Sequence, residues 1–342
     1  MPRYLGFETP PEHPVPRKAA VLLVNLGTPA APTTDAVCDY LAEFLSDPRV
    51  VELPRWIWWP ILHGYILRTR PRRSAEAYAK VWRDDGSPLL VFSEGLTEAV
   101  RAEIEHRNAG KVEVALAMTY GEPSVAATVE SLMARSVRRL LVLPLFPQYS
   151  ATSTGAAIDA VMRVMQKLRW TPDLRTLNDY HADAGYLAAL VGSVQAHWAR
   201  HGRGQKLLLS FHGIPQKYAE AGDPYPDQCH ETARRLGDAL GLPDDGIVVT
   251  FQSRLGRQPW LRPYTDETIE QLAHQDVETL DVLCPGFAVD CLETLEEVAL
   301  RYRAVFLTNG GKQFRYIPSL NASTAHATAL ADIATRQMAG WV

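Results

Sequence analysis

The sequence lacks several features that mark common classes of protein. It has only four cysteines, Cys38, Cys229, Cys284 and Cys291, and no Cys-x-x-Cys pair, so it indicates neither a disulfide framework nor a zinc knuckle. We therefore expect a reducing, cytoplasmic compartment. No apolar run approaches the roughly 20 residues needed to span a bilayer. The net charge of −4 gives no electrostatic reason to bind nucleic acid, so we expect no such partner.

Two segments in the first quarter of the chain are unusual in composition. Residues 1–18 are rich in proline and contain no long apolar run, which predicts a mobile arm rather than a targeting peptide. Residues 56–67 are the most apolar stretch, but they are too short to cross a membrane. Their three tryptophans, flanked by Arg55 and Arg68, suit a surface that contacts a membrane interface or lines the binding site of an apolar ligand. A partly buried helix under a loop explains them equally well.

Short runs of aliphatic and β-branched residues alternate with amphipathic stretches along the rest of the chain. The runs are apolar at successive positions, which is typical of parallel strands covered by helices on both faces. The expected strands are residues 19–26, 112–120, 140–146, 174–180, 207–211, 247–252 and 280–284. The stretches between them are long enough for crossover helices. The pattern predicts an α/β fold with domains at 19–170 and 171–320 and a closing helix within 321–342.

Ligands of open parallel sheets bind beyond the carboxyl ends of the strands, so the loops there are the first place to look for chemistry. The loop after the first strand, at residues 25–29, matches neither GxGxxG nor GxxxxGK[ST] and gives little support to nucleotide binding. The loop after the fifth strand carries His212. A neutral imidazole could accept a proton or bind a borderline metal there, although a lone histidine at a strand end is often structural.

Three acids follow the seventh expected strand. Asp290, Glu293 and Glu297 are spaced i, i+3 and i+7, so on an α-helix they would share one face near the N-terminus. Acids in a first turn also favour the helix dipole. The pattern leaves open a track for a divalent cation and a solvated acidic face.

Taken together, these motifs closely resemble the ferrochelatase family. The match runs from about Ala20 to Ile333 and keeps the family's order of motifs. The motifs are NLGTP, FLSDPRV, LPLFPQYSATSTG, SFHGIP, GDPYP, FQSRLGRQPWL and DCLETLEE. The resemblance implies two Rossmann-like domains, each with a four-stranded parallel sheet, and a porphyrin cleft between them.

The resemblance also implies roles for individual residues. His212 corresponds to the catalytic histidine and Glu293 to its acidic partner, and Asp290 and Glu297 complete the family's acidic ridge, so that all four would handle the metal. The residues that would contact the porphyrin are Leu26, Arg70, Tyr78, Ser87, Tyr120, Tyr149 and Trp260. Arg70, Tyr78 and Ser87 would belong to a cleft lip at residues 55–90, although the spacing between the last two is wider than in the family.

Two departures from the family pattern concern cysteine. Many members carry histidine directly after the Asp that opens the acidic helix, where this chain has Cys291. Members with an iron–sulfur cluster have one cysteine just after PQYS and three near the C-terminus. Here the first position is Ala151 and no cysteine follows Cys291, so ligand count excludes a [2Fe–2S] cluster and we expect no permanently bound cofactor.

The activity implied by the resemblance is insertion of Fe²⁺ into protoporphyrin IX, with release of two protons, in the last step of haem biosynthesis. We expect a cytoplasmic monomer that touches the inner face of the membrane transiently through residues 56–67, although the residues do not separate monomer from dimer. Coproporphyrin III remains open as the substrate. Two other functions also remain open: insertion of another metal into a different tetrapyrrole, and a non-catalytic porphyrin carrier with His212 as an axial ligand.

Overall fold

A computed structural model describes residues 4–7, 17–108, 111–256 and 258–342 of the chain. Most of the predicted N-terminal arm, residues 1–3 and 8–16, lies outside the described residues. Within the short stretch 4–7, the backbone N–H of Leu5 donates to the carbonyl of Lys167 at 2.8 Å, and its carbonyl accepts from the N–H of Arg169 at 2.8 Å. This part of the arm is therefore attached to the first unit described below.

The chain divides into two compact units, each of which contains one sheet. The first unit comprises Met1–Leu145, Ala151–Asp179 and Ala327–Val342, and the second comprises Phe146–Ser150 and Tyr180–His326. The sequence placed the boundary after residue 170, whereas residues up to Asp179 belong to the first unit. The reason is β4 (Asp173–Thr176), which pairs in parallel with β3 (Val137–Pro144) and so extends the first sheet.

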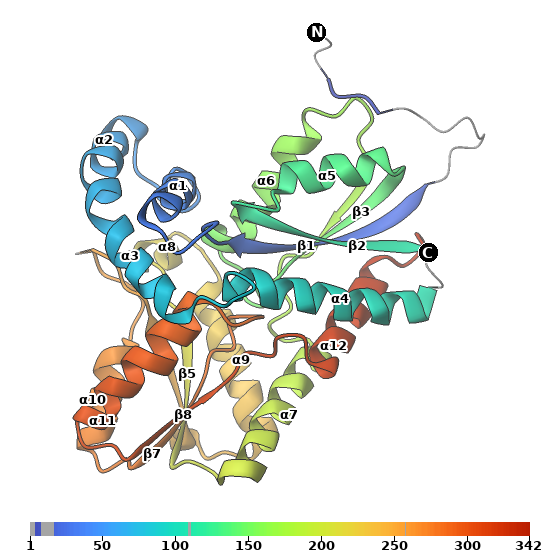
Figure 1. Cartoon of the computed structure of the whole chain (residues 1–342). Helices are drawn as coiled ribbons and strands as arrows, with labels where there is room; N and C mark the ends of the chain where they lie inside the picture. Colours follow the sequence, from blue (N-terminus) through green and yellow to red (C-terminus); the bar gives the residue numbers. More distant parts are fainter. Residues whose placement is uncertain (1–3, 8–16, 109–110, 257) are drawn as a thin grey trace. The chain divides into compact units, whose positions relative to one another are not determined.

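The first sheet has the strand order β2-β1-β3-β4, and all its pairs are parallel. Its central strand β1 (Lys18–Gly27) is buried from Ala19 to Val24 because aliphatic side chains occupy successive positions and helices cover both faces. β2 (Val112–Tyr120) pairs with β1 so that Tyr120 lies opposite Gly27, at the carboxyl edge. Figure 1 shows α4 (Pro88–Asn108) on one face of this sheet and α5 (Val125–Ala134) and α6 (Ala156–Met165) on the other.

The other helices of the first unit connect or flank these elements. They are α1 (Thr34–Leu45), α2 (Arg55–Ile61), η1 (Leu62–Ile66), α3 (Leu67–Val81), η2 (Ala151–Gly155) and most of α12 (Thr324–Gln337). Three arginines attach the last residues of the chain to this unit. Arg107 on α4 pairs with Asp332 at 2.6 Å, Arg139 donates to the carbonyl of Trp341 at 2.5 Å, and Arg175 donates to the carbonyl of Ala339 at 3.1 Å.

The helices α2, η1 and α3 follow one another directly and include the apolar residues 56–67. Trp58 is buried and its indole N–H donates to the carbonyl of Leu45 at 2.7 Å, while Leu62 is fully buried beside it. The opposite face is open: Trp56 is 78% exposed and Tyr65 is 64% exposed. The segment therefore has one face in the core and one apolar face in solvent. Among the helices of the described residues, none is both long enough and apolar enough to cross a membrane.

The second sheet has the strand order β6-β5-β7-β8 and is also parallel throughout. Its strands are β5 (Lys206–His212), β6 (Ile247–Gln252), β7 (Thr279–Leu283) and β8 (Gln313–Ile317). β8 was not among the strands predicted from the sequence, because this edge strand is polar at alternate positions and only partly buried. The two parallel four-stranded sheets confirm the predicted α/β fold class.

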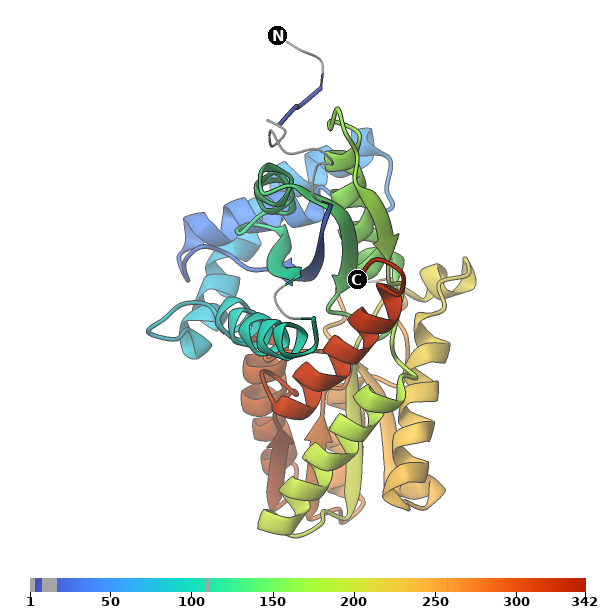
Figure 2. The ribbon, with the colours of Figure 1, turned by 90° about the vertical axis from the view of Figure 1, so that its right-hand side faces the viewer.

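Helices cover both faces of the second sheet as well. Figure 1 shows α10 (Thr265–His274) and α11 (Arg303–Thr308) on one side, and Figure 2 views the unit from the other side, where α7 (Ala184–His201) and α9 (Tyr225–Leu240) run next to each other. Two of the remaining helices follow strand ends, α8 (Gln216–Glu220) after β5 and η4 (Glu293–Tyr302) after β7, and the short η3 (Asp244–Gly246) directly precedes β6.

Candidate functional site

His212 is the last residue of β5, at the carboxyl edge of the second sheet. Its Nδ1 lies 2.7 Å from the carbonyl oxygen of Gly213. A carbonyl oxygen can only accept, so Nδ1 must carry the hydrogen and Nε2 must be the unprotonated nitrogen of the neutral ring. The side chain is half-buried, so the backbone sets its tautomer without sealing it from solvent. The strand end therefore presents an imidazole whose Nε2 can accept a proton.

The glycine after His212 is required by close packing. The N–H of Gly213 donates to the carbonyl of Gln252 at 2.8 Å. A Cβ at this position would lie 2.9 Å from that carbonyl and 3.2 Å from the ring of Trp260. Trp260 is half-buried, and its indole N–H donates to the carbonyl of Leu255 at 2.8 Å. The ring of Trp260, a predicted porphyrin contact, thus packs against the backbone that fixes His212.

The acidic helix η4 is a π-helix, not an α-helix. Its i to i+5 hydrogen bonding makes every turn wider, so residues four and five apart lie on the same side. It begins at Glu293, after Leu292 as N-cap, and ends at Tyr302. Glu293 and Glu297 therefore share a face of one helix. The prediction that Asp290 shares this face is wrong, because Asp290 lies before the helix begins.

Asp290 is instead a buried anchor, 3% exposed. Its Oδ1 accepts from the hydroxyls of Thr294 at 2.9 Å and Tyr316 at 2.5 Å, and its Oδ2 accepts from the side-chain amide of Asn321 at 2.7 Å. Its backbone N–H donates to the amide oxygen of Asn321 at 2.8 Å. Burial and the charge of Asp290 raise the pKa of the Tyr316 phenol, so it stays a donor. These contacts fix the entry to η4.

Gln252 connects the two predicted catalytic residues. It pairs with His212 across β5 and β6, and its Nε2 donates to the backbone carbonyl of Glu293 at 3.1 Å. Its Oε1 accepts from the hydroxyl of Ser210 at 2.6 Å, and the side chain is only 1% exposed. His212 and Glu293 are thus both tied to Gln252, His212 through the pairing of the two strands and Glu293 through the buried side-chain amide. Gln252 was given no role from the sequence, although a polar residue that ends an apolar strand at the ligand edge was an available signal.

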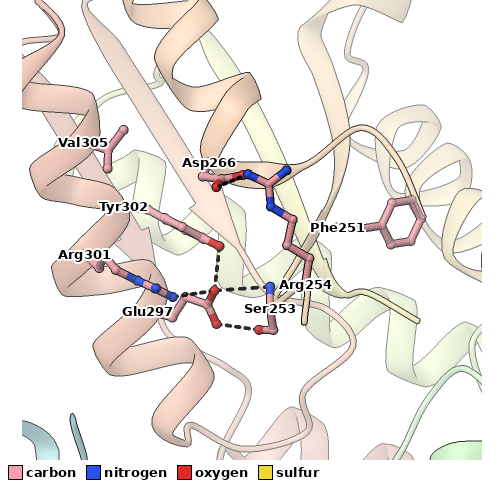
Figure 3. Close-up of a pocket in the computed structure, with 8 residues that line it drawn as sticks. All are labelled: Phe251, Ser253, Arg254, Asp266, Glu297, Arg301, Tyr302 and Val305. Atoms are coloured by element: carbon pink, nitrogen blue, oxygen red, sulfur yellow. Dashed lines mark hydrogen bonds and ion pairs between the residues drawn. The ribbon is translucent and has the colours of Figure 1, made fainter. Parts of the chain in front are cut away.

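Glu297 lies one turn beyond Glu293 and lines a pocket of about 290 Å³ in the second unit. Figure 3 shows its carboxylate held from three sides. Its Oε1 accepts from the N–H of Ser253 at 3.2 Å and from the hydroxyl of Tyr302 at 2.7 Å, and it forms an ion pair with Arg301 at 2.6 Å. Its Oε2 accepts from the hydroxyl of Ser253 at 2.5 Å. Glu297 is 8% exposed, so the carboxylate is a nearly buried charge balanced by Arg301.

Cys291, which stands where many relatives of the resembled family carry histidine, is 2% exposed. Burial raises the pKa of its thiol well above the usual range, and the charge of Glu293 raises it further. The thiol is therefore protonated at neutral pH and is a weak metal ligand. Across the described residues, no three or more His, Cys, Asp or Glu side chains come together as a group that could hold a metal ion. The four predicted metal-handling residues do not form a closed metal site.

The predicted porphyrin contacts of the first unit lie at the carboxyl edge of its sheet and on the lip, residues 55–90. Leu26 and Tyr120 lie at the carboxyl ends of neighbouring strands and pack in one apolar cluster with Tyr40 and Ala156. Burial raises the pKa of the Tyr120 phenol, with the charge of Asp47 adding to the effect. The carboxyl edge of the first sheet is therefore lined by aromatic and aliphatic side chains.

The other contacts belong to the lip and to the second unit. Ser87 is 3% exposed, and its hydroxyl lies 2.6 Å from that of Thr28, just beyond the carboxyl end of β1. Arg70 and Tyr78 lie on α3, where burial lowers the pKa of Arg70 and leaves Tyr78 8% exposed. Tyr149 belongs to the second unit, and its N–H donates to the side chain of Gln228 at 2.6 Å.

Comparisons with known proteins bear on the family and the fold of the chain. A family model described as Ferrochelatase matches residues 18–338. The chain is 53% identical over 329 residues to a ferrochelatase of Thioalkalivibrio sulfidiphilus and 50% identical over 329 residues to one of Marinobacter nauticus; each alignment covers 96% of this chain and 89% of the relative.

Two solved structures share the fold at low identity. SirB from Bacillus subtilis with Fe³⁺ gives a TM-score of 0.54 at 12% identity, covering 95% of this chain and 97% of SirB. CbiX, the terminal enzyme for biosynthesis of sirohaem in denitrifying bacteria, gives 0.50 at 15% identity, covering 93% and 98%. At these identities the likeness supports the fold alone.

Proposed function

The chain belongs to the ferrochelatase family, and from this premise we propose that its porphyrin is protoporphyrin IX and that His212 takes a proton from it. Family membership makes the chain a metal-chelating enzyme of haem biosynthesis, with a porphyrin and iron as substrates. The residue roles below, the choice of porphyrin and the contact with the membrane are our proposals.

Metal insertion requires a base, because two pyrrole N–H protons must leave as the ring nitrogens bind Fe²⁺. The observation that carries our assignment is the 2.7 Å contact between Nδ1 of His212 and the carbonyl of Gly213. It fixes the tautomer in which Nε2 has the lone pair. A neutral imidazole is the most common general base in enzymes. Gln252 and Trp260 pack closely against Gly213 and so hold the loop in this geometry.

Glu293 and Glu297 would serve the metal and the protons. Both project from the wide helix η4, and Glu293 is half-buried next to Cys291. Fe²⁺ is a borderline cation that binds carboxylate oxygen only weakly compared with nitrogen-rich sites, so such a path can release the ion to the porphyrin. Asp290 would act indirectly, since both its oxygens are already engaged in fixing the start of the helix.

The choice of protoporphyrin IX rests on the exposed apolar surface that residues 56–67 form on the first unit. Its exposed members are Trp56, Trp59, Ile61 and Tyr65. Arg55 stacks on Trp59 at 5.8 Å, and Arg68, Arg72 and Arg73 are exposed on α3. Aromatic side chains beside arginines suit the interface of an anionic lipid bilayer. A poorly soluble porphyrin with two apolar vinyl groups would be taken up there more readily than the four-propionate coproporphyrin III. We propose transient contact with the cytoplasmic membrane face by a monomer.

The assignment of His212 is tested by His212→Ala. Turnover is measured under anaerobic conditions with Fe²⁺ and either protoporphyrin IX or coproporphyrin III, and porphyrin binding is measured by fluorescence quenching. Removing a general base should lower kcat at least about 100-fold and leave porphyrin affinity within a factor of about three.

The matched control is His274→Ala, which removes an exposed histidine at the end of α10 and should behave as wild type. Wild-type turnover in His212→Ala would overturn the role of His212 as the base. A higher kcat/KM for coproporphyrin III than for protoporphyrin IX in the wild type would overturn the choice of substrate. Binding without turnover in the wild type would support the carrier alternative.

A further inference from the structure

The pocket that contains Glu297 is lined by two acids and two arginines (Figure 3). Its lining residues are Phe251, Ser253, Arg254, Asp266, Glu297, Arg301, Tyr302 and Val305. Divalent cations favour carboxylate oxygens, and cationic side chains next to them repel the ion. The charges of the two arginines therefore oppose the attraction of a cation by the two acids.

The two arginines are held differently. Arg254 is fixed between Asp266 at 3.1 Å and Glu267 at 2.6 Å, both at the start of α10. The one ion pair of Arg301 within the described residues is with Glu297, four residues earlier on η4. The side chain of Arg301 is 49% exposed, whereas that of Glu297 is 11% exposed. Arg301 is the most exposed of the three residues that donate to Glu297.

The other donors of Glu297 would stay in place if Arg301 moved. Ser253 contributes both its backbone N–H and its hydroxyl, from a residue with a positive φ of 65°. Tyr302 is 5% exposed, and burial together with the charge of Glu297 raises the pKa of its phenol, so it stays a neutral donor. A swing of the long Arg301 side chain into water would therefore unmask the charge of Glu297 without disturbing its position.

We propose that Arg301 is a gate on the Fe²⁺ path. When it is paired with Glu297, it neutralises the carboxylate and repels the incoming ion; when it turns outward, Glu297 attracts the ion. The inference rests on the proposed function, in which Glu297 lies on that path. Arg301 is a positioning residue here, because it acts on the ion through Glu297 and does not touch the porphyrin.

The test is Arg301→Gln, which removes the charge. Steady-state rates are measured anaerobically with Fe²⁺ varied at saturating porphyrin, then with porphyrin varied at saturating Fe²⁺. The KM for Fe²⁺ should fall about three- to tenfold, as expected for one partly exposed charge pair, while the KM for porphyrin stays unchanged. Arg301→Lys keeps the charge and should keep the wild-type KM. Arg301→Met, which retains an apolar stem against Tyr302, provides a second neutral variant if Arg301→Gln folds poorly.

Two further experiments distinguish the proposed role of Arg301 as a gate from the proposed role of Glu297 on the Fe²⁺ path. Arg303→Gln makes the same change in net charge at an exposed residue of α11 and should leave the KM for Fe²⁺ as in the wild type. In a Glu297→Gln background, Arg301→Gln should have no effect on the KM for Fe²⁺. If Glu297→Gln raises that KM but Arg301→Gln does not lower it, the gate is refuted and the path stands. If neither changes it, both the gate and the path are refuted.

Discussion

A buried histidine next to the site should make the stability of this protein depend on pH. His326 is fully buried near the start of α12. Its Nδ1 lies 2.8 Å from the carbonyl oxygen of Asn321, so Nδ1 carries the hydrogen. Its Nε2 is buried and has no hydrogen-bond partner among the described residues. Burial lowers the pKa of His326 to about 4, because a proton on Nε2 would have no acceptor; the Asn321 carbonyl opposes the shift only partly.

The sign and size of the effect follow from linkage. In the unfolded chain the pKa of histidine is 6.5, so between about pH 6.5 and 4 the unfolded state binds a proton that the folded state does not. The free energy of unfolding should therefore fall as the pH is lowered through this window, by about 1.4 kcal/mol per pH unit and roughly 3 kcal/mol in total. Above pH 6.5 both states are neutral and His326 contributes no pH dependence.

The assay is urea unfolding at pH 7.5, 6.0 and 5.0, followed by circular dichroism, for the wild type and His326→Asn. Asparagine can keep a side-chain N–H toward the carbonyl of Asn321 but does not titrate. Between pH 7.5 and 5.0 the wild type should lose about 2 kcal/mol more than the variant. His274→Asn, at an exposed residue, should keep the wild-type dependence. Parallel curves for wild type and His326→Asn would refute the reasoning.

Two other expectations concern the membrane and the cofactor. Replacing both Trp56 and Trp59 with serine should weaken cosedimentation with anionic phospholipid vesicles about tenfold, because the two rings are exposed and amphipathic. The control Met162→Ser, at an exposed residue of α6, should sediment as the wild type does. Equal sedimentation of the wild type, the double variant and the control would count against the lip as a membrane contact. The purified protein should contain no acid-labile sulfide and show no iron–sulfur absorbance before porphyrin is added, since no cysteine follows Cys291; stoichiometric sulfide would contradict the ligand count.

The sheet architecture could be predicted because its strands are unusually easy to recognise. β1 and β5 are largely apolar at successive positions, which is typical of a strand covered on both faces. β8 could not be recognised in the same way, since Gln313 and Arg315 interrupt its apolar residues and the strand lies at the edge of the sheet. Its position depends on pairing with β7, a contact that no local pattern of residues encodes.

The candidate site was predictable in residue type but less so in geometry. The spacing of Asp290, Glu293 and Glu297 fits an α-helix, yet the segment winds as a π-helix that starts after Asp290. The difference depends on tertiary hydrogen bonds: Asp290 is held by Asn321, and the carbonyl of Glu293 is held by Gln252. Helical periodicity describes contacts within a segment and carries no information about such distant donors.

The division of the chain also has a consequence for how the protein is made. The first unit includes Ala327–Val342, whose carbonyls and Asp332 are held by Arg107, Arg139 and Arg175. A ribosome makes these last residues only after all of Tyr180–His326, so the first unit to emerge is the last to be completed. During translation, α4 and the first sheet therefore lack their contacts with Ala327–Val342 until synthesis has passed the second unit. By then all four strands of the second sheet have been made, and the second unit can fold around His212.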